Sequence, residues 1–174
     1  MKKVMMIVLA LGLMSGILVG CGESDIQKVE GDNSAEQQKV EEKKQETLKI
    51  GDAVKFDGLK VKVLGVREFK GDQFFKPEND KFVLVQVEVV NTTNEPQTVS
   101  SMLQTRLMDA EGQSQDAALT GDEKGQLDGE IGPGRKLKGE VAFDVMKSDY
   151  YEFIFEDPFT TGQAIWKIDA KDIK

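Results

Sequence analysis

The sequence predicts an all-β fold, a β-sandwich of seven to eight short strands preceded by a signal peptide and a disordered tether. From Thr47 onward, apolar residues recur at every second position, as they do in strands with one buried face. Turn residues separate these runs at short intervals, a spacing typical of sandwiches. Residues 47–174 are enough for one domain.

Residues 1–20 have the pattern of a secretory signal peptide. Lys2 and Lys3 precede an uncharged apolar run over residues 4–19, and the small residue Gly20 ends it. An uncleaved anchor helix is the alternative, although the run is slightly short of the roughly 20 apolar residues that a spanning helix needs. Both alternatives export everything after this segment.

The only cysteine of the chain, Cys21, follows Leu18, Val19 and Gly20 directly. This arrangement resembles the lipobox of bacterial lipoproteins. The resemblance implies that a diacylglycerol is attached to the thiol, that the signal is removed before Cys21, and that a membrane-bound lipoprotein results on the extracytoplasmic face. Palmitate labelling would follow from the same chemistry.

The composition excludes several classes of function. Loss of the two signal lysines takes the net charge from −8 to −10, so nucleic acid and anionic lipid headgroups repel the mature chain. With no histidine and one cysteine, the chain cannot build a Ser-His-Asp triad, a Cys-His pair, a His/Cys zinc site or an intrachain disulfide. No cofactor is expected, and the excess of lysine over arginine favours a Gram-positive source.

Residues 21–46 are expected to form the lipidated cysteine and a charged, flexible tether. Residues 22–46 hold eight acidic and four basic side chains and only scattered apolar ones, too few to offset the entropy of ordering. A short polar helix from Ser34 to Lys44 is an alternative, but it lacks an apolar stripe.

A β-hairpin is predicted to open the folded domain. Alternation up to Phe56 meets the dipeptide Asp57-Gly58, which favours a tight turn, and resumes from Leu59. Gly65 interrupts the pattern and indicates a β-bulge before Val66. The apolar positions are Leu48, Ile50, Val54 and Phe56 before the turn and Leu59, Val61 and Val63 after it.

The strongest predicted strand covers residues 82–91. Its four alternating valines, at positions 83, 85, 87 and 89, define one buried face. The other face begins with Phe82 and Leu84 and continues with Gln86 and Glu88. We therefore expect this strand to be covered on one side throughout and on the other side only at its start.

Four further strands are predicted after residue 97. The first spans residues 98–108, with Leu103, Thr105 and Leu107 inward. The next follows the turn at residues 132–134 and spans residues 137–145. The last two have Tyr151, Phe153 and Phe155, and then Ala164, Trp166 and Ile168, on their inner faces.

The order of these motifs resembles the DUF4352 family of exported bacterial proteins. The motifs are Ile50-Gly51, the run from Lys81 to Val87 ending at Asn91, Asp109-Ala110-Glu111-Gly112, and Ile131-Gly132-Pro133-Gly134 running into Lys138 to Phe143. The resemblance covers about residues 47–168. It implies an immunoglobulin-like sandwich in the cell envelope, and it carries no catalytic residue onto this chain.

Residues 116–134 form an acidic, glycine-rich loop that is a weak candidate for calcium binding. Carboxylates on a flexible backbone suit calcium, a hard ion that prefers oxygen ligands. The spacing fits no EF-hand, however, so a solvated loop is the alternative. The carboxylates are Asp116, Asp122, Glu123, Asp128 and Glu130.

Three aromatic residues, Phe74, Phe75 and Tyr150, are candidates for contact with a partner. Phe74 and Phe75 are adjacent in a polar loop, so we expect one ring to cover the end of the sandwich and the other to face a partner. Tyr150 is a candidate surface residue, whereas Trp166 is expected in the core.

The leading hypothesis is a non-enzymatic binding or accessory domain, monomeric and lipid-anchored, that contacts another envelope protein or an incoming element. No Ser-x-x-Lys or Gly-x-Ser-x-Gly motif occurs. A small-ligand or calcium binder using residues 116–134 is one alternative. A wall hydrolase with paired carboxylates is the other.

Overall fold

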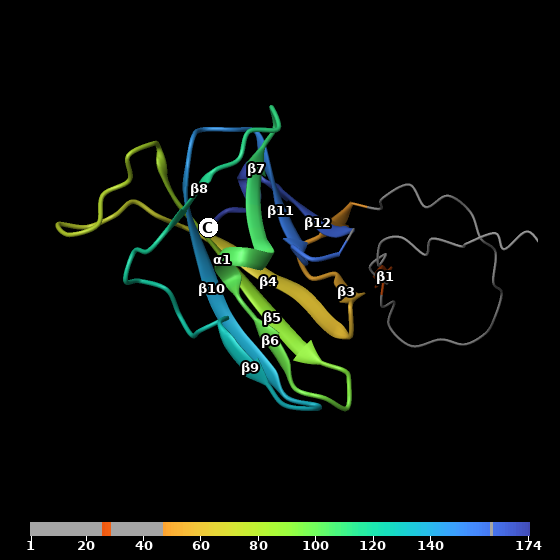
Figure 1. Cartoon of the computed structure of the whole chain (residues 1–174). Helices are drawn as coiled ribbons and strands as arrows, with labels where there is room; N and C mark the ends of the chain where they lie inside the picture. The colour runs from red at the N-terminus through yellow and green to blue at the C-terminus, as the bar shows by residue number, and fades with distance from the viewer. Residues whose placement is uncertain (1–25, 29–46, 161) are drawn as a thin grey trace, which may run out of the picture.

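A computed structural model describes residues 26–28, 47–160 and 162–174 and shows two β-sheets packed face to face (Figure 1). Residues 1–20, Cys21 and most of the tether lie outside the described residues. The larger sheet contains, in spatial order, β1 (Ile26–Lys28), β3 (Ala53–Phe56), β4 (Leu59–Phe69), β5 (Lys81–Asn91), β10 (Lys136–Val145) and β8 (Asp116–Ala118). The smaller sheet contains β2 (Leu48–Lys49), β12 (Gln163–Asp169), β11 (Tyr150–Glu156) and β7 (Thr105–Asp109).

Three short elements complete the described chain. The strands β6 (Gln97–Val99) and β9 (Gly129–Ile131) pair with each other as a two-stranded ribbon. The helix α1 (Ser101–Gln104) separates β6 from β7, and a 3₁₀ turn (Ala170–Asp172) follows β12. All pairings are antiparallel except that of β2 with β12. The predicted immunoglobulin-like β-sandwich is confirmed.

The core lies between the two sheets and confirms the alternation expected from the sequence. The four valines of β5 are fully buried, as are Phe153, Trp166 and Ile168 on the smaller sheet. Aromatic rings join the layers edge to face. Phe56 meets Phe155 at 5.6 Å between ring centroids, and Phe143 meets Phe153 at 6.3 Å. Burial of this apolar surface is the main force that holds the sheets together.

The predicted hairpin and bulge are both present in the larger sheet. Asp57 and Gly58 have φ angles of 46° and 81°, as a type I′ turn between β3 and β4 requires. The register of β4 against β5 shifts between Val63 and Gly65, which places the bulge where the alternation breaks.

The outer face of β5 is covered only at its start, as expected. Phe82 and Leu84 are buried there together with Ala142 of β10, and Phe69 stacks on Phe82 at 6.0 Å. Gln86 and Glu88, farther along the same face, are only half-buried. The outer face of the larger sheet therefore carries a small second cluster beside the main core.

The prediction of one strand over residues 98–108 is wrong. This segment is divided into β6, α1 and β7, because β6 pairs with β9 while β7 pairs with β11 of the smaller sheet. The chain changes partner sheets through the single turn of α1. Consequently Leu103 is exposed and Thr105 is only half-buried, whereas Leu107 is inward as predicted.

The strand count also differs from the expected seven or eight. The described residues form twelve strands, because β1, β2, β6, β8 and β9 contain only two or three residues each. Runs this short have too few positions to show a period of two. The additional strands do not change the fold class.

The strand β1 lies within the segment predicted to be a flexible tether, and that prediction is wrong for its three residues. Its backbone pairs with β3, with Ile26 opposite Phe56 and Lys28 opposite Val54. Main-chain pairing of this kind needs no apolar stripe, only an edge strand with unpaired backbone groups. The β3 edge supplies those groups.

Candidate functional site

The loop between β4 and β5 contains a hydrogen-bonded turn that presents Phe74 and Phe75. The Asp72 carboxylate accepts the backbone N–H groups of Phe74 and Phe75 at 2.7 and 2.8 Å, and the Asp72 N–H donates to the Phe75 carbonyl at 2.7 Å. The two N–H donors hold the pKa of Asp72 below its ordinary value. Because Gly71 has a φ of 83°, this turn favours glycine at its first position.

Both rings are exposed, but to different degrees. Phe74 is 78% exposed and Phe75 is 40% exposed. A Cβ atom on Gly121 would lie 3.1 Å from Cε2 of Phe75, so the Phe75 ring rests on the segment between β8 and β9. Phe75 is therefore the partly covered ring, and the surface that covers it is this neighbouring loop. Phe74 is the ring that faces outward.

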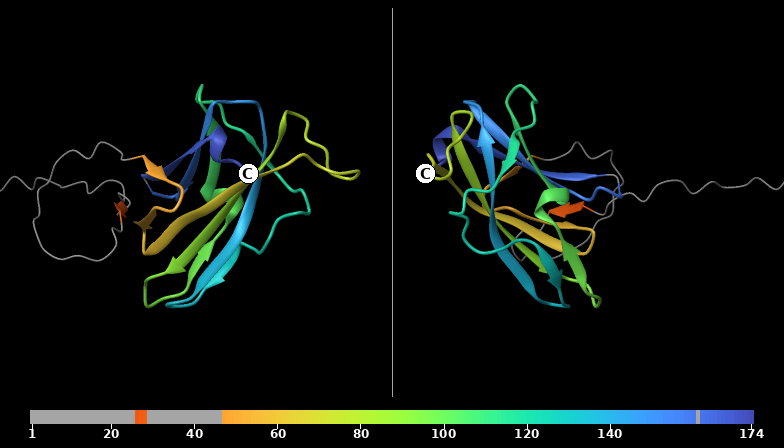
Figure 2. Two further views of the ribbon diagram at one scale, coloured as in Figure 1. Left: turned by 180° about the vertical axis from the view of Figure 1, so that it is seen from behind. Right: turned by 60° about the vertical axis from the view of Figure 1, so that its left-hand side comes forward.

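The loop at residues 70–80 and the segment between β8 and β9 lie on the same side of the molecule in both rotated views (Figure 2). Leu119, which lies in this segment, is exposed, and so are Met102 and Leu103 of α1. Asp128 accepts hydrogen bonds from the backbone N–H and the hydroxyl of Ser101, at 2.7 and 2.8 Å. These bonds tie α1 to the end of the same segment.

An ion-pair cluster fastens the segment to the outer face of the larger sheet. Arg67 donates to both carboxylate oxygens of Glu140, at 3.1 and 2.7 Å, and to the side chain and carbonyl of Asp122, at 2.7 and 2.8 Å. The Lys124 N–H donates to Glu140 at 2.9 Å. Burial raises the pKa of Glu140, but the hydrogen bonds and charges of Arg67 and Lys124 outweigh it, so the pKa lies below its ordinary value.

The side chains of the five candidate calcium ligands do not converge on one point. Asp122 binds Arg67, Glu123 accepts from Thr120, and Asp128 accepts from Ser101. The other two, Asp116 and Glu130, lie on the different strands β8 and β9. In the part of the chain that the structure describes, no three acidic side chains gather into a group that could hold a metal ion.

The remaining aromatic candidates belong to the smaller sheet. Tyr150 is half-buried at the start of β11, and the Nζ atom of Lys167 lies 4.0 Å from its ring centroid. This cation–π contact covers the ring that was a candidate for partner contact. Trp166 is fully buried, as predicted, and its indole N–H donates to the Asp52 carbonyl at 3.1 Å.

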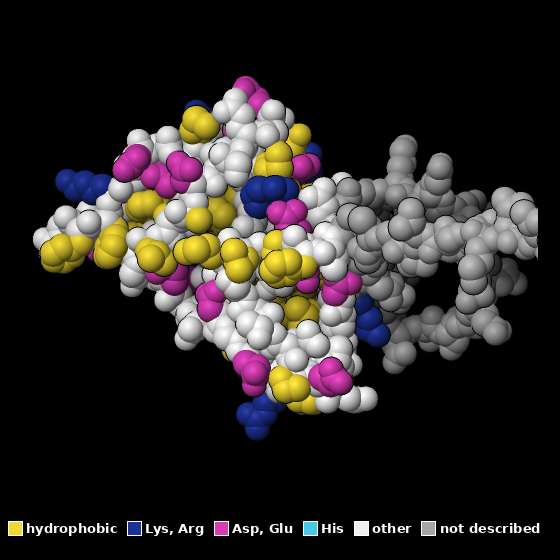
Figure 3. All heavy atoms as spheres, viewed as in Figure 1, with side chains coloured by type: hydrophobic (Ala, Val, Ile, Leu, Met, Phe, Trp, Pro, Cys, Tyr) yellow, Lys and Arg dark blue, Asp and Glu magenta, His cyan; other side chains and the backbone are white. Residues whose placement is uncertain are grey.

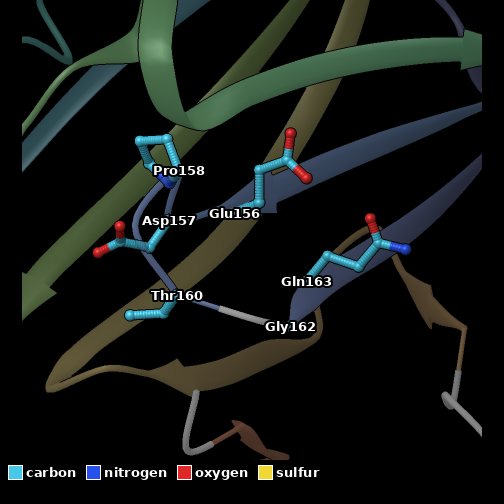
Figure 4. A pocket seen from close by; sticks show the side chains of 6 residues that line it. All are labelled: Glu156, Asp157, Pro158, Thr160, Gly162 and Gln163. Atoms are coloured by element: carbon cyan, nitrogen blue, oxygen red, sulfur yellow. The ribbon is translucent and has the colours of Figure 1, made fainter. Parts of the chain in front are cut away.

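A shallow hollow of about 430 Å³ lies at the turn between β11 and β12 (Figure 4). Its lining includes two adjacent acids, but the side chains of Glu156 and Asp157 point apart (Figure 4). Glu156 pairs with Arg106 at 3.3 Å, and Asp157 accepts the Phe159 N–H at 2.8 Å. A glycosidase needs two acids that face one substrate bond, which this arrangement does not provide.

Sequence reasoning missed the Arg67 cluster and the exposure of Met102, Leu103 and Leu119. Arg67 and Glu140 are 73 positions apart, so no local pattern joins them. For Met102 and Leu103 on α1, one signal was available in the sequence. Ser100-Ser101 is a common start for a helical turn, and it would have interrupted the strand assumed there.

Among the described residues, no helix has the length and apolar character needed to cross a membrane.

A family model described as "Domain of unknown function (DUF4352)" matches residues 48–165. The comparison with curated proteins gives no match.

Several solved structures are similar to this chain. A candidate lipoprotein (ycdA) from Bacillus subtilis is 25% identical with a TM-score of 0.55; the match covers 76% of this chain but only 40% of that protein. The yjhA protein of the same species is 17% identical with a TM-score of 0.56 and is covered completely, over 71% of this chain.

A third solved structure, a β-sandwich protein from Clostridium difficile, is 14% identical with a TM-score of 0.50, over 75% of this chain and 99% of its own length. At these low identities, yjhA and the clostridial protein show the fold alone. The family model covers most of the sandwich, from β2 into β12. The resemblance noted in the sequence is thereby confirmed, and the chain belongs to the DUF4352 family.

Proposed function

We propose that this chain is a non-enzymatic binding domain, anchored by lipid at Cys21 on the extracytoplasmic face of the membrane, which holds another envelope protein. The similarity to a candidate lipoprotein supports the anchor. The turn that presents Phe74 and Phe75 is the single observation that carries the binding role. Two exposed aromatic rings on a fixed backbone are typical of contact surfaces rather than of a solvated loop.

The other two hypotheses receive less support from the geometry. A calcium binder would need carboxylates that converge, whereas Asp122, Glu123 and Asp128 each engage a separate protein partner. A wall hydrolase would need two acids facing one cleft, and the two acids at the hollow point apart (Figure 4). A binding surface requires neither feature.

Site-specific crosslinking in living cells tests the proposal. The full chain carries a photoreactive amino acid in place of Phe74, and a matched version carries it in place of Phe159, which is 89% exposed on the turn between β11 and β12. We expect a defined protein adduct from position 74 and none of the same mass from position 159. Equal adducts from both positions, or none from position 74, would remove the binding role from this loop.

A stability control separates lost contact from lost folding. Phe74→Ser together with Phe75→Ser should shift the melting temperature by only a few degrees, because exposed rings contribute little to the core. A collapse of this double variant would assign both rings to structure.

A further inference from the structure

We use the name apolar band for a set of five exposed apolar side chains. It consists of Phe74, Phe75, Leu119, Met102 and Leu103, which are between 40% and 84% exposed. Figure 3 shows a row of apolar side chains running from the tip of the 70–80 loop across this face to α1. A monomeric protein rarely leaves so extended an apolar strip in water unless something binds to it.

The backbone beneath the band is fixed by hydrogen bonds. Asp72 holds the turn under the two rings, and Arg67 binds Asp122 three residues after Leu119. Asp128 holds the first residue of α1. A surface that is already ordered loses little conformational entropy when it binds, which favours recognition over random stickiness.

The surroundings of the band are acidic. Residues 70–80 and 116–130 together carry eight carboxylates and three lysines, and α1 carries no charge. In Figure 3, acidic side chains lie both above and below the apolar row. Two of these carboxylates, Asp116 and Glu130, are exposed and lie at the two ends of the second segment.

From this charge pattern we infer that the apolar band binds a basic, amphipathic protein segment. Aliphatic or aromatic side chains of the segment would lie on the band. Its Lys or Arg side chains would face the carboxylates of residues 70–80 and 116–130, which we call the acidic rim. Opposite charges at the rim guide such a segment to the surface and exclude acidic competitors. The same rim repels an anionic bilayer and a second copy of this acidic chain. This inference rests on the proposed binding function and specifies the chemistry of the partner.

A peptide titration tests the inference on the full chain held in phosphatidylcholine nanodiscs. The probe is a fluorescent Leu/Lys peptide, compared with a Leu/Glu peptide of the same pattern and with a Ser/Lys peptide that lacks apolar residues. Empty discs measure binding to lipid alone. We expect only the Leu/Lys peptide to bind above the empty-disc level, with an affinity that falls as salt is added.

Variants then assign the binding to the band. Phe74→Ser with Leu119→Ser should weaken binding by about tenfold or more, because exposed aromatic anchors dominate such contacts. Phe159→Ser is the matched control for an exposed ring elsewhere and should leave the affinity unchanged. Equal affinity in all three proteins would overturn the inference.

The rim is tested by charge neutralisation. Asp116→Asn with Glu130→Gln should lower the association rate constant by about threefold at low salt. Glu95→Gln with Glu111→Gln removes the same charge from other exposed loops and is the matched control. If both pairs of substitutions lower the association rate constant equally, the effect comes from the net charge of the protein and not from the rim. If the Leu/Glu peptide binds as well as the Leu/Lys peptide, the preference for a basic partner is wrong.

The outcomes also distinguish this inference from the proposed function. A protein adduct at position 74 with no peptide preference would keep the binding role and reject a basic partner. Loss of the adduct would reject the binding role itself. Binding of the band to empty anionic vesicles, or dimerisation that Leu119→Ser abolishes, would identify lipid or a second copy as the occupant and would overturn the inference.

Discussion

Gly139 of β10 and Leu127 of the preceding loop share one space in the core. A Cβ atom on Gly139 would lie 2.6 Å from the backbone nitrogen of Leu127, whose own side chain is buried in the main cluster. The missing side chain at position 139 therefore lets the loop cross β10 and place Leu127 inside the sandwich.

Gly139→Ala should destabilise the protein by about 1–3 kcal/mol, because the added methyl group must displace backbone. Chemical denaturation measures the change. Gly65→Ala is the matched control, since nothing lies within 4 Å of a Cβ there, and it should have a much smaller effect. Equal losses at both positions would contradict the shared-space account.

Arg67→Ala should cost about 3 kcal/mol of unfolding free energy, because it leaves the Glu140 carboxylate buried without its cation. The double variant Arg67→Met with Glu140→Gln should recover part of that loss, because no uncompensated charge remains. If the single and double variants are equally unstable, then packing of the arginine stem matters more than the ion pair.

The same pair predicts an acid-dependent part of the stability. The folded state holds the pKa of Glu140 below its ordinary value of 4.5, so the folded chain binds fewer protons than the unfolded chain in that range. This contribution is present above the ordinary pKa and is lost as the pH falls through the folded pKa. Glu140→Gln should therefore lose less stability than the wild type between about pH 5 and pH 3, as measured by urea denaturation.

Trp166→Ala should destabilise the fold by about 3–5 kcal/mol, as large-to-small changes in a core do. Trp166 packs at 6.1 Å from the Phe153 ring and donates to Asp52, so both contacts are lost. Thermal unfolding followed by circular dichroism measures the effect, with Phe159→Ala as the exposed control. A harmless Trp166→Ala would contradict the register of β12.

Deletion of residues 22–46 removes β1 but should leave the sandwich folded. Three residues of backbone pairing gain roughly 1 kcal/mol per hydrogen bond, and the cost of ordering the strand offsets much of this gain. We expect melting within a few degrees of the undeleted protein. A large loss of stability would show that β1 is part of the domain.

Cys21→Ala should abolish metabolic labelling with palmitate and release the protein from the membrane or leave it unprocessed. The reason is chemical, because the chain has no second thiol to carry a diacylglycerol. Membrane fractionation beside the labelling separates the two results. Continued labelling of the variant would contradict the lipobox.

The sequence predicted those features that depend on local pattern. The alternating valines of β5 fixed its buried face, and Asp57-Gly58 marked the hairpin. Leu103 was misplaced because a period of two fits its neighbours, whereas the pairing partner of each strand decides where the chain must turn. No local pattern could show the ion pair between Arg67 and Glu140, since folding alone brings them together.

The candidate site, too, was predictable from local pattern only in part. Two adjacent rings in a polar loop already indicated that one must face water, and Phe74 does. The rest of the apolar band, Leu119, Met102 and Leu103, comes from two segments that only the fold brings to one face. Backbone pairing of β1 leaves no signature in side-chain chemistry, so a tether was the natural prediction for Ile26–Lys28.

The pairing of β1 with β3 limits how far the domain can stand from its anchor. Ile26 is five residues after Cys21, and an extended chain spans about 3.5 Å per residue, so roughly 17 Å separate them at most. If Cys21 carries the predicted lipid, the β3 edge stays within about two nanometres of the bilayer while the pairing lasts. The 70–80 loop lies at the opposite end of the molecule from β1 (Figures 1 and 2). A connection this short would therefore orient the domain with Phe74 facing away from the membrane.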